Sequence, residues 1–179
     1  MKRPYRMLDL FSGLGGASEA ARDRGWDVVT VDINPDFGPS HICDVTKFVP
    51  DGRFHFVWIS PPCDEFARES MPWCRTGKTP SMDLVVAGLN VCGSVNPPLW
   101  CLENVRGAAK YISPLVGKPT VTGPFYLWGG LPKSFVVPAI DHFKERLSSS
   151  RKAERAKVPY ALSLAMILAA ERDLEARMR

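Results

Sequence analysis

A strand, a glycine-rich turn and a helix follow one another at the start of the chain, and this order constrains the fold more than any other feature. A mostly apolar run over residues 5–11 ends at the turn Ser12-Gly13-Leu14-Gly15-Gly16, and an alanine-rich stretch then extends to Arg24. Residues 27–33 predict a second strand, with Asp32 near its end. A unit of this kind predicts a parallel sheet whose functional residues lie at the carboxyl ends of its strands.

Further apolar runs extend this pattern along the chain. Strands are expected at residues 54–59, 99–102 and 125–128, and the first two are followed by Ser60-Pro61-Pro62-Cys63 and Glu103-Asn104. A helix is expected from Thr79-Pro80 to about Cys92, just before Gly93, and a closing helix over about 158–178. The polar segment 64–78 shows no clean period, which indicates a long mobile loop. The alternation predicts an α/β fold with a mostly parallel, doubly wound sheet.

The composition bounds the class of protein. The 179 residues are 45% hydrophobic, so the whole chain, 1–179, is expected to form a single domain with one core. Lys and Arg outnumber Asp and Glu by 23 to 19, and this net charge of +4 is compatible with an anionic substrate without requiring one. The five cysteines form no C-x-x-C pair, so neither a disulfide framework nor a metal site is predicted. No export signal or long apolar run occurs, which predicts a cytoplasmic protein without a membrane anchor.

The glycine turn and two acidic residues are candidates for cofactor binding. Such a turn lets the backbone approach a ligand, and Asp32 can accept both hydroxyls of a ribose, although plain packing of strand against helix would also explain the turn. Residues 13–16 do not follow G-x-G-x-x-G, which favours a cofactor with an adenosine and no pyrophosphate over a dinucleotide. Asp44 either bonds an adenine amino group or caps the next helix.

Cys63 and Glu103 are the candidates for chemistry. The prolines before Cys63 stiffen a loop that presents a thiol at the edge of the sheet, although a lone cysteine is commonly a small buried hydrophobe. Glu103 is either an ion-paired or capping group, or an acid whose pKa is raised by partial burial. A thiolate beside a protonated carboxyl suggests nucleophilic addition to an electron-poor ring.

Other motifs are weaker or fail. Gly77-Lys78-Thr79 ends like a phosphate-binding loop, but Pro72 stands where that motif needs glycine. A zinc deaminase would need a cysteine at the position of Phe66. A basic run over residues 146–157, which includes Arg151, either contacts phosphates or forms a solvated surface.

Several motifs, in order along the chain, resemble those of the cytosine-C5 methyltransferase family. Residues 9–16, Asp-Leu-Phe-Ser-Gly-Leu-Gly-Gly, resemble the D-L-F-x-G-x-G-G that binds S-adenosylmethionine, and Val31-Asp32 resembles the ribose-binding position. Pro62-Cys63 resembles the P-C of the catalytic loop, and Glu103-Asn104-Val105 resembles E-N-V. Val158-Pro159 and the helix after it resemble the closing helix of the cofactor pocket.

This resemblance implies a Rossmann-like methyltransferase fold, S-adenosylmethionine as cofactor and S-adenosylhomocysteine as product. It implies that Cys63 adds to C6 of cytosine while Glu103 donates a proton to N3, so that C5 becomes nucleophilic and takes the methyl group. Asn104 would brace the loop of Cys63, and it is grouped with Arg75 and Arg151 as an expected substrate-binding residue. The expected cofactor-binding residues are Asp9, Phe11, Gly13, Leu14, Gly15, Gly16, Asp32, Ile33, Asp44, Val45, Pro61, Pro62 and Val158.

Departures from the family pattern bear on the substrate. Asp64 stands where the family has glutamine, no arginine occurs over residues 120–124 where a cytosine-contacting arginine is expected, and Lys157 replaces a small polar residue. Only a short segment separates the strand at 125–128 from the closing helix, so no separate target-recognition domain is expected.

The sequence thus predicts a minimal methyltransferase of cytosine in DNA. RNA or a free cytidine nucleotide is the alternative substrate, and a non-catalytic, cofactor-binding accessory subunit is the alternative class. Either a homodimer or a separate partner would then supply specificity.

Overall fold

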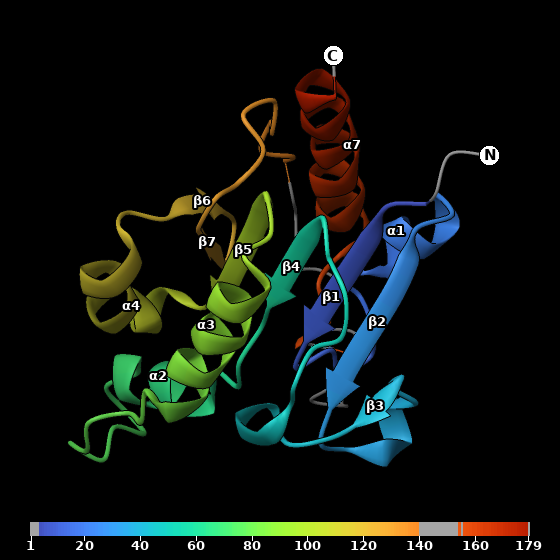
Figure 1. Cartoon of the computed structure of the whole chain (residues 1–179). Helices are drawn as coiled ribbons and strands as arrows, with labels where there is room; N and C mark the ends of the chain where they lie inside the picture. The colour runs from blue at the N-terminus through green and yellow to red at the C-terminus, as the bar shows by residue number, and fades with distance from the viewer. Residues whose placement is uncertain (1–3, 140–153, 155, 179) are drawn as a thin grey trace.

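Within the described residues, seven strands form one sheet in the order β3-β2-β1-β4-β5-β7-β6. The computed structural model describes residues 4–139, 154 and 156–178 (Figure 1). The first five strands pair in parallel, whereas β7 pairs antiparallel with both β5 and β6. This confirms the predicted α/β fold with a mostly parallel sheet. The strands are β1 (Arg6–Leu10), β2 (Asp27–Asp32), β3 (His41–Ile42), β4 (Phe56–Ile59), β5 (Leu99–Asn104), β6 (Thr120–Thr122) and β7 (Phe125–Trp128).

Helices connect the strands and cover the sheet. Within the described part of the chain, no helix is both long and apolar enough to span a membrane. The predicted closing helix is present as α7. The α-helices are α1 (Glu19–Asp23), α2 (Asp64–Ser70), α3 (Asp83–Val95), α4 (Ala109–Val116) and α7 (Tyr160–Arg177), and the 3-10 helices are η1 (Pro35–Phe37), η2 (Val45–Lys47) and η3 (Arg106–Ala108).

Alternate side chains of the central strands face two separate cores. Met7 and Trp58 pack with α1 and α7 on one side of the sheet, whereas Leu8 and Val57 pack with α3 and α4 on the other. Figure 1 shows α3 and α7 on opposite sides of the sheet. Strands buried on both faces are apolar throughout, which explains why their runs were recognisable in the sequence. The sheet is therefore doubly wound.

Helix α2 occupies the first half of the segment 64–78, for which the sequence analysis predicted a mobile loop. The loop prediction is wrong for these residues because a helix of seven residues is too short to show a clear period. Asp64 and Glu65 lie in its first turn, where acidic side chains favour the positive end of the helix dipole. Phe66 is buried and anchors the helix in the core on the α3 side.

Helix α3 begins and ends later than predicted. It starts at Asp83, whose N–H donates to Ser81 Oγ at 3.1 Å, rather than at Pro80. It ends at Val95 and is capped by Asn96, which adopts a left-handed conformation with φ of 47°, so Gly93 lies inside the helix. Strand β5 also runs further than predicted and includes Glu103 and Asn104, because the antiparallel neighbour β7 pairs with both residues. The sequence analysis did not identify α4 or β6.

Replacing Leu162 by alanine is expected to destabilise the fold. Leu162 of α7 is fully buried in the core between α1, α7 and the sheet, so truncation leaves a cavity. We expect the free energy of unfolding to fall by about 2–5 kcal/mol, measured by urea denaturation. Leu115→Ala is the matched control because Leu115 is 56% exposed. Equal losses in the two variants would contradict the described packing of α7.

Candidate active site

A cavity of about 570 Å³ lies at the carboxyl ends of β1, β2, β4 and β5. In Figure 1 the arrowheads of β1, β2 and β4 point to this lower edge of the sheet. Cys63 and Glu103, the two residues predicted to perform chemistry, both line the cavity. The segment before α7, from Ala156 to Val158, closes one of its sides. The cavity is therefore lined by the loops after four strands and by the segment before α7.

The glycine turn after β1 holds an unusual backbone. Phe11 adopts φ of 59°, rare for a residue with a side chain, and Gly13 adopts φ of 50°. The N–H of Gly13 donates to Asp32 Oδ2 at 2.8 Å, and the N–H of Asn34 donates to Asp32 Oδ1 at 2.9 Å. Asp32 thus links the turn after β1 to the turn after β2. Asp32 lines the cavity, and each of its carboxylate oxygens can accept another hydrogen bond.

Asp9 is a fully buried carboxylate at the base of the cavity. Its Oδ2 accepts a hydrogen bond from Ser18 Oγ at 2.6 Å, whereas its Oδ1 has no hydrogen-bond partner among the described residues. Burial raises the pKa of Asp9 to about 7, and the Ser18 hydrogen bond opposes this shift only in part. A buried carboxyl oxygen without a partner is a costly feature in a fold, and Asp9 carries it at the lining of the cavity.

Gly16 allows the closing segment to approach the turn. A Cβ at this position would lie 2.4 Å from the carbonyl oxygen of Val158 and 2.6 Å from Lys157 Cγ. Lys157 Nζ also forms an ion pair with Glu19 Oε2 at 2.7 Å, which joins the segment to α1. The glycine at position 16 is therefore required by the packing of the cavity wall.

Asn104 braces the loop that carries the thiol. Its side chain is buried, and its Nδ2 donates to the carbonyl oxygen of Pro61 at 3.0 Å. Its Oδ1 accepts the N–H of Val105 at 2.9 Å. Because Pro61 lies two residues before Cys63, this bond ties the thiol loop after β4 to the end of β5.

A second contact fixes α2, which begins directly after Cys63. A Cβ on Gly107 of η3 would lie 2.3 Å from the carbonyl oxygen of Phe66, so only glycine permits this approach of η3 to α2. Glu103 and Gly107 belong to one continuous stretch of chain. The carboxylate and the helix behind the thiol are therefore positioned by the same segment.

The structure places nearly all the residues predicted for the cofactor in the lining of this cavity. Gly15 is the exception, since its neighbour is the guanidinium of Arg22. Asp44 lines the cavity and also caps η2 by accepting the N–H of Thr46 at 2.9 Å, which lowers the pKa of Asp44. The capping interpretation of Asp44 is therefore confirmed, and its contact with an adenine amino group stays a prediction. The lining includes Asp9, Phe11, Gly13, Leu14, Gly16, Asp32, Ile33, Asp44, Val45, Pro61, Pro62 and Val158.

Of the three residues predicted to bind substrate, the structure describes Asn104 and Arg75, and neither lines the cavity. Asn104 does not line the cavity, because its side chain is buried and engaged with Pro61. Arg75 is exposed on the chain after α2 and is not part of the lining. Arg151 lies outside the described residues, as does most of the basic run at 146–157.

Several lining residues were not predicted from the sequence. Leu84 and Phe37 were missed because Leu84, in the first turn of α3, and Phe37, in η1, belong to no motif of the sequence analysis. Lys157 and Phe125 were seen, but neither was assigned to the cofactor. The additional lining residues are Ser12, Ala17, Asn34, Phe37, Cys43, Ser60, Asp64, Leu84, Val105, Phe125, Ala156 and Lys157. Ser12 and Ala17 could have been predicted to line the cavity because they lie at the two ends of the glycine turn.

Comparison with known proteins gives one match in sequence. No family model matches the chain. Over 80 residues it is 28% identical to a protein of Methanocaldococcus jannaschii named "Putative type II methyltransferase M.MjaORF1200P". The match covers 42% of this chain and only 22% of that relative, so this chain corresponds to a small part of the relative's length. This similarity agrees with the methyltransferase resemblance of the motifs.

Solved structures give likenesses at low identity. A protein of an Escherichia coli prophage, described as a "putative DNA modification methyltransferase", is 22% identical with a TM-score of 0.45, over 61% of this chain and 34% of its own. The 16S rRNA methylase RmtB is 17% identical with a TM-score of 0.47, over 71% and 55% of the two chains. At these scores the fold assignment rests on the strand order of this chain itself.

Replacing Gly16 by alanine is expected to loosen the closing segment. The added methyl group would overlap backbone atoms of Val158, which cannot move aside by a side-chain rotation. We expect the free energy of unfolding to fall by about 1–3 kcal/mol, as for other overpacked positions, measured by urea denaturation. Gly93→Ala is the matched control because a Cβ there meets nothing within 4 Å. No loss in Gly16→Ala would show that the segment does not pack on the turn.

The burial of Asp9 predicts a dependence of stability on pH. Because the folded-state pKa of Asp9 is raised to about 7, the folded chain keeps a proton that the unfolded chain has released above its ordinary pKa of 3.8. The contribution of Asp9 to stability is therefore complete below the unfolded-state pKa and is lost as the pH rises through 7.

Asp9→Asn removes this titration and keeps an oxygen for the Ser18 hydroxyl. We expect its stability relative to the wild type to rise by on the order of a few kcal/mol between about pH 5 and about pH 8. Urea denaturation at the two pH values measures the change. Asp36→Asn, at an exposed position, controls for the altered net charge. A constant difference between Asp9→Asn and the wild type would contradict the raised pKa.

Proposed function

We propose that the protein is an S-adenosylmethionine-dependent methyltransferase that methylates C5 of cytosine, with DNA as its substrate. The observation that carries this proposal is that Cys63 and Glu103 line the same cavity as the glycine turn and Asp32. A nucleophile and an acid are thereby placed within one space next to a candidate nucleoside site. The motif resemblance and the sequence match to a methyltransferase support the same conclusion.

The lining of the cavity fits the proposed cofactor. The exposed side chain of Ile33, with Phe11 and Leu14, offers apolar surface for an adenine ring. Asp32 can accept hydrogen bonds from ribose hydroxyls and Asp44 one from an adenine amino group. Near the glycine turn, the unpartnered Oδ1 of Asp9 favours a positively charged or hydrogen-bond-donating group. When bound, S-adenosylmethionine supplies an electrophilic methyl group to C5 of the substrate.

The chain's own residues prepare the cytosine ring. The thiolate of Cys63 forms a bond with C6, while the carboxyl of Glu103 gives its proton to N3, and the electron pair released in the ring makes C5 nucleophilic. After C5 has been methylated, solvent water takes the C5 proton, the electron pair of that C–H bond forms the C5–C6 double bond, and Cys63 leaves C6 as a thiolate. The proton on N3 returns to Glu103. The ring is restored, and both side chains recover their starting states.

Asn104 contributes to this reaction by position. Its bond to Pro61 holds the Cys63 loop against the end of β5, where Glu103 lies, so the nucleophile and the acid keep a fixed relation. Small displacements of such groups are costly because addition requires a close approach of the reacting atoms. In duplex DNA the target base would also have to leave the stack to reach this cavity.

The type of nucleic acid and the source of specificity form a separate part of the proposal. Only a short stretch links β7 to α7, so we propose that specificity is low or comes from a second copy or another partner. Arg75 and Arg151 remain proposed contacts to the substrate. RNA and free cytidine nucleotides are alternative substrates. A non-catalytic accessory subunit is the second candidate function, favoured by Asp64 in place of glutamine beside the nucleophile.

Methyl transfer from labelled S-adenosylmethionine to duplex DNA, single-stranded DNA, RNA and cytidine nucleotides tests the proposal. We expect label at C5 of cytosine in DNA, a loss of at least about a thousandfold in Cys63→Ala, and a loss of about a hundredfold or more in Glu103→Gln. Cys92→Ala is the matched control because Cys92 lies in α3, outside both the cavity lining and the chain between α2 and α3. Cofactor binding without transfer to any substrate would instead support the accessory-subunit function.

A further inference from the structure

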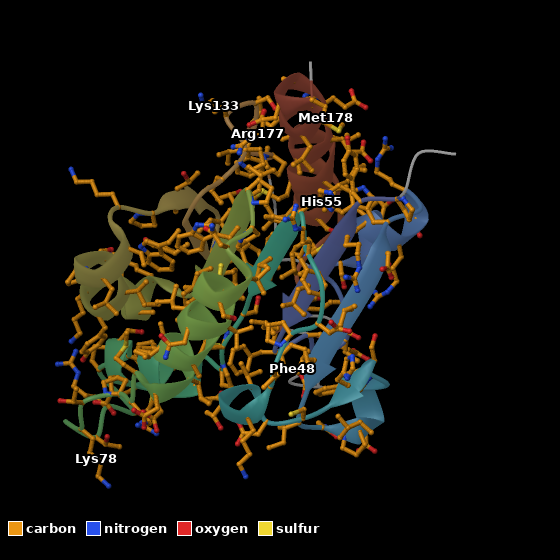
Figure 2. The ribbon with its side chains drawn as sticks, viewed as in Figure 1. Phe48, His55, Lys78, Lys133, Arg177 and Met178 are labelled. Carbon is orange, nitrogen blue, oxygen red and sulfur yellow. The ribbon has the colours of Figure 1, made fainter. Side chains whose placement is uncertain are left out.

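The chain between α2 and α3 connects two elements that border the candidate active site, although none of residues 71–82 lines the cavity itself. It leaves from α2, whose first residue Asp64 lines the cavity, and it returns to α3, whose residue Leu84 lines it too. We call residues 71–82 the wall segment. Figure 2 shows Lys78 of this segment at its outer tip, on the same edge of the molecule as the strand ends.

One carboxylate of α2 holds the wall segment in place. Glu69 Oε1 accepts the N–H of Thr76 at 3.0 Å and also the Thr76 hydroxyl, and its Oε2 accepts the N–H of Gly77 at 2.9 Å. The Glu69 side chain is only 6% exposed, although α2 lies at the surface. These hydrogen bonds, the Thr76 hydroxyl first among them, lower the pKa of Glu69 to about 2. Glu69 Oε1 also pairs with Arg68 Nε at 3.0 Å within α2, so both oxygens of the carboxylate have hydrogen-bond partners.

Glu65 makes a second attachment one turn earlier on α2. Its Oε2 accepts the N–H of Ser81 at 2.7 Å. Residues four apart lie on the same face of a helix, so Glu65 and Glu69 present one acidic face to the wall segment. Glu69 is the stronger attachment, because it receives both a side-chain and two backbone donors from the segment.

Between these attachments the wall segment exposes side chains suited to nucleic acid. Trp73 is 81% exposed, which is unusual for the largest apolar side chain. Arg75 and Lys78, within the next five residues of the chain, are exposed as well. Exposed aromatic rings stack on bases, and nearby cations contact phosphates, in proteins that bind single strands. A segment without its own helix or strand can hold these groups in one arrangement only if it is tied down elsewhere.

We propose that Glu69 is a positioning residue that fixes the wall segment, so that Trp73, Arg75 and Lys78 contact a single-stranded or locally unpaired nucleic-acid substrate. This inference rests on the proposed function and adds to it the part of the chain that meets the substrate. Glu69 touches neither the cavity nor the reacting atoms; it acts through the backbone of Thr76 and Gly77. Its effect therefore falls on substrate binding rather than on the chemical step.

The test uses Glu69→Gln in the full chain, with Glu175→Gln as the matched control on the exposed face of α7. Hydrogen exchange measures the amides of Thr76 and Gly77, and fluorescence anisotropy measures affinity for a cytosine-containing single-stranded DNA oligonucleotide. In Glu69→Gln we expect both amides to exchange at least about tenfold faster, because charge-assisted hydrogen bonds are lost. We also expect the affinity for the oligonucleotide to fall, and the KM for it to rise, by roughly tenfold, with kcat and cofactor affinity within about twofold.

Two further variants separate positioning from general stability. Thr76→Val removes the hydroxyl donor and should weaken oligonucleotide binding, whereas Thr76→Ser keeps the donor and should restore it. Trp73→Ala should weaken binding without changing the exchange of the Thr76 and Gly77 amides. Thermal denaturation of each variant confirms that it folds, since Trp73 and Thr76 are exposed.

The outcomes distinguish this inference from the proposed function. Unchanged amide exchange in Glu69→Gln, or faster exchange with unchanged oligonucleotide affinity, would overturn the positioning role. If the wild-type protein bound the oligonucleotide but transferred no methyl group to any substrate, the proposed function would fall. The exchange and affinity measurements would still decide the role of Glu69.

Discussion

Parallel pairing of β1, β2, β4 and β5 is the constraint on which the candidate active site depends. In parallel strands all carboxyl ends lie on one edge, so loops distant in sequence meet there. The strand order reverses between β1 and β4, because β2 and β3 extend the sheet on one side and β5 on the other. The loops after β1 and β4 separate at this point and leave room for a ligand. The glycine turn follows β1, and Cys63 follows β4.

The alternation of side chains along the strands explains where charged groups occur. Asp9, Trp58 and Cys101 are aligned across β1, β4 and β5, and Glu103 lies two residues beyond Cys101 on the same face. That face is packed against α1 and α7 until it reaches the cavity. Both carboxyl groups line the cavity, Asp9 fully buried and Glu103 half-buried. The sign of the Asp9 pKa shift follows from the same position.

The sequence predicted the structure well where backbone conformation or burial in the sheet restricts the residue type. Apolar runs identified the central strands, and the glycine turn and Asp32 identified their shared edge. Reasoning from periodicity failed for α2, which is too short, and for the start of α3, where Ser81 rather than Thr79 meets the first helical residues. The bracing bond of Asn104 was expected only from the family resemblance. The hydrogen bonds that Glu69 accepts from Thr76 and Gly77 join a helix to a loop, and no pattern of residue types predicts them.

The two sides of the candidate active site are held by different kinds of contact. The thiol loop and α2 are fixed by a buried hydrogen bond from Asn104 and by the close approach at Gly107, both of which resist displacement because there is no space to move into. The wall segment is fixed mainly by hydrogen bonds to two carboxylates near the surface. Because few apolar contacts hold the wall segment, the arrangement of Trp73, Arg75 and Lys78 depends on these hydrogen bonds, whereas Cys63 and Glu103 depend on buried packing. A chain with little sequence between β7 and α7 would gain its contact with nucleic acid from this segment.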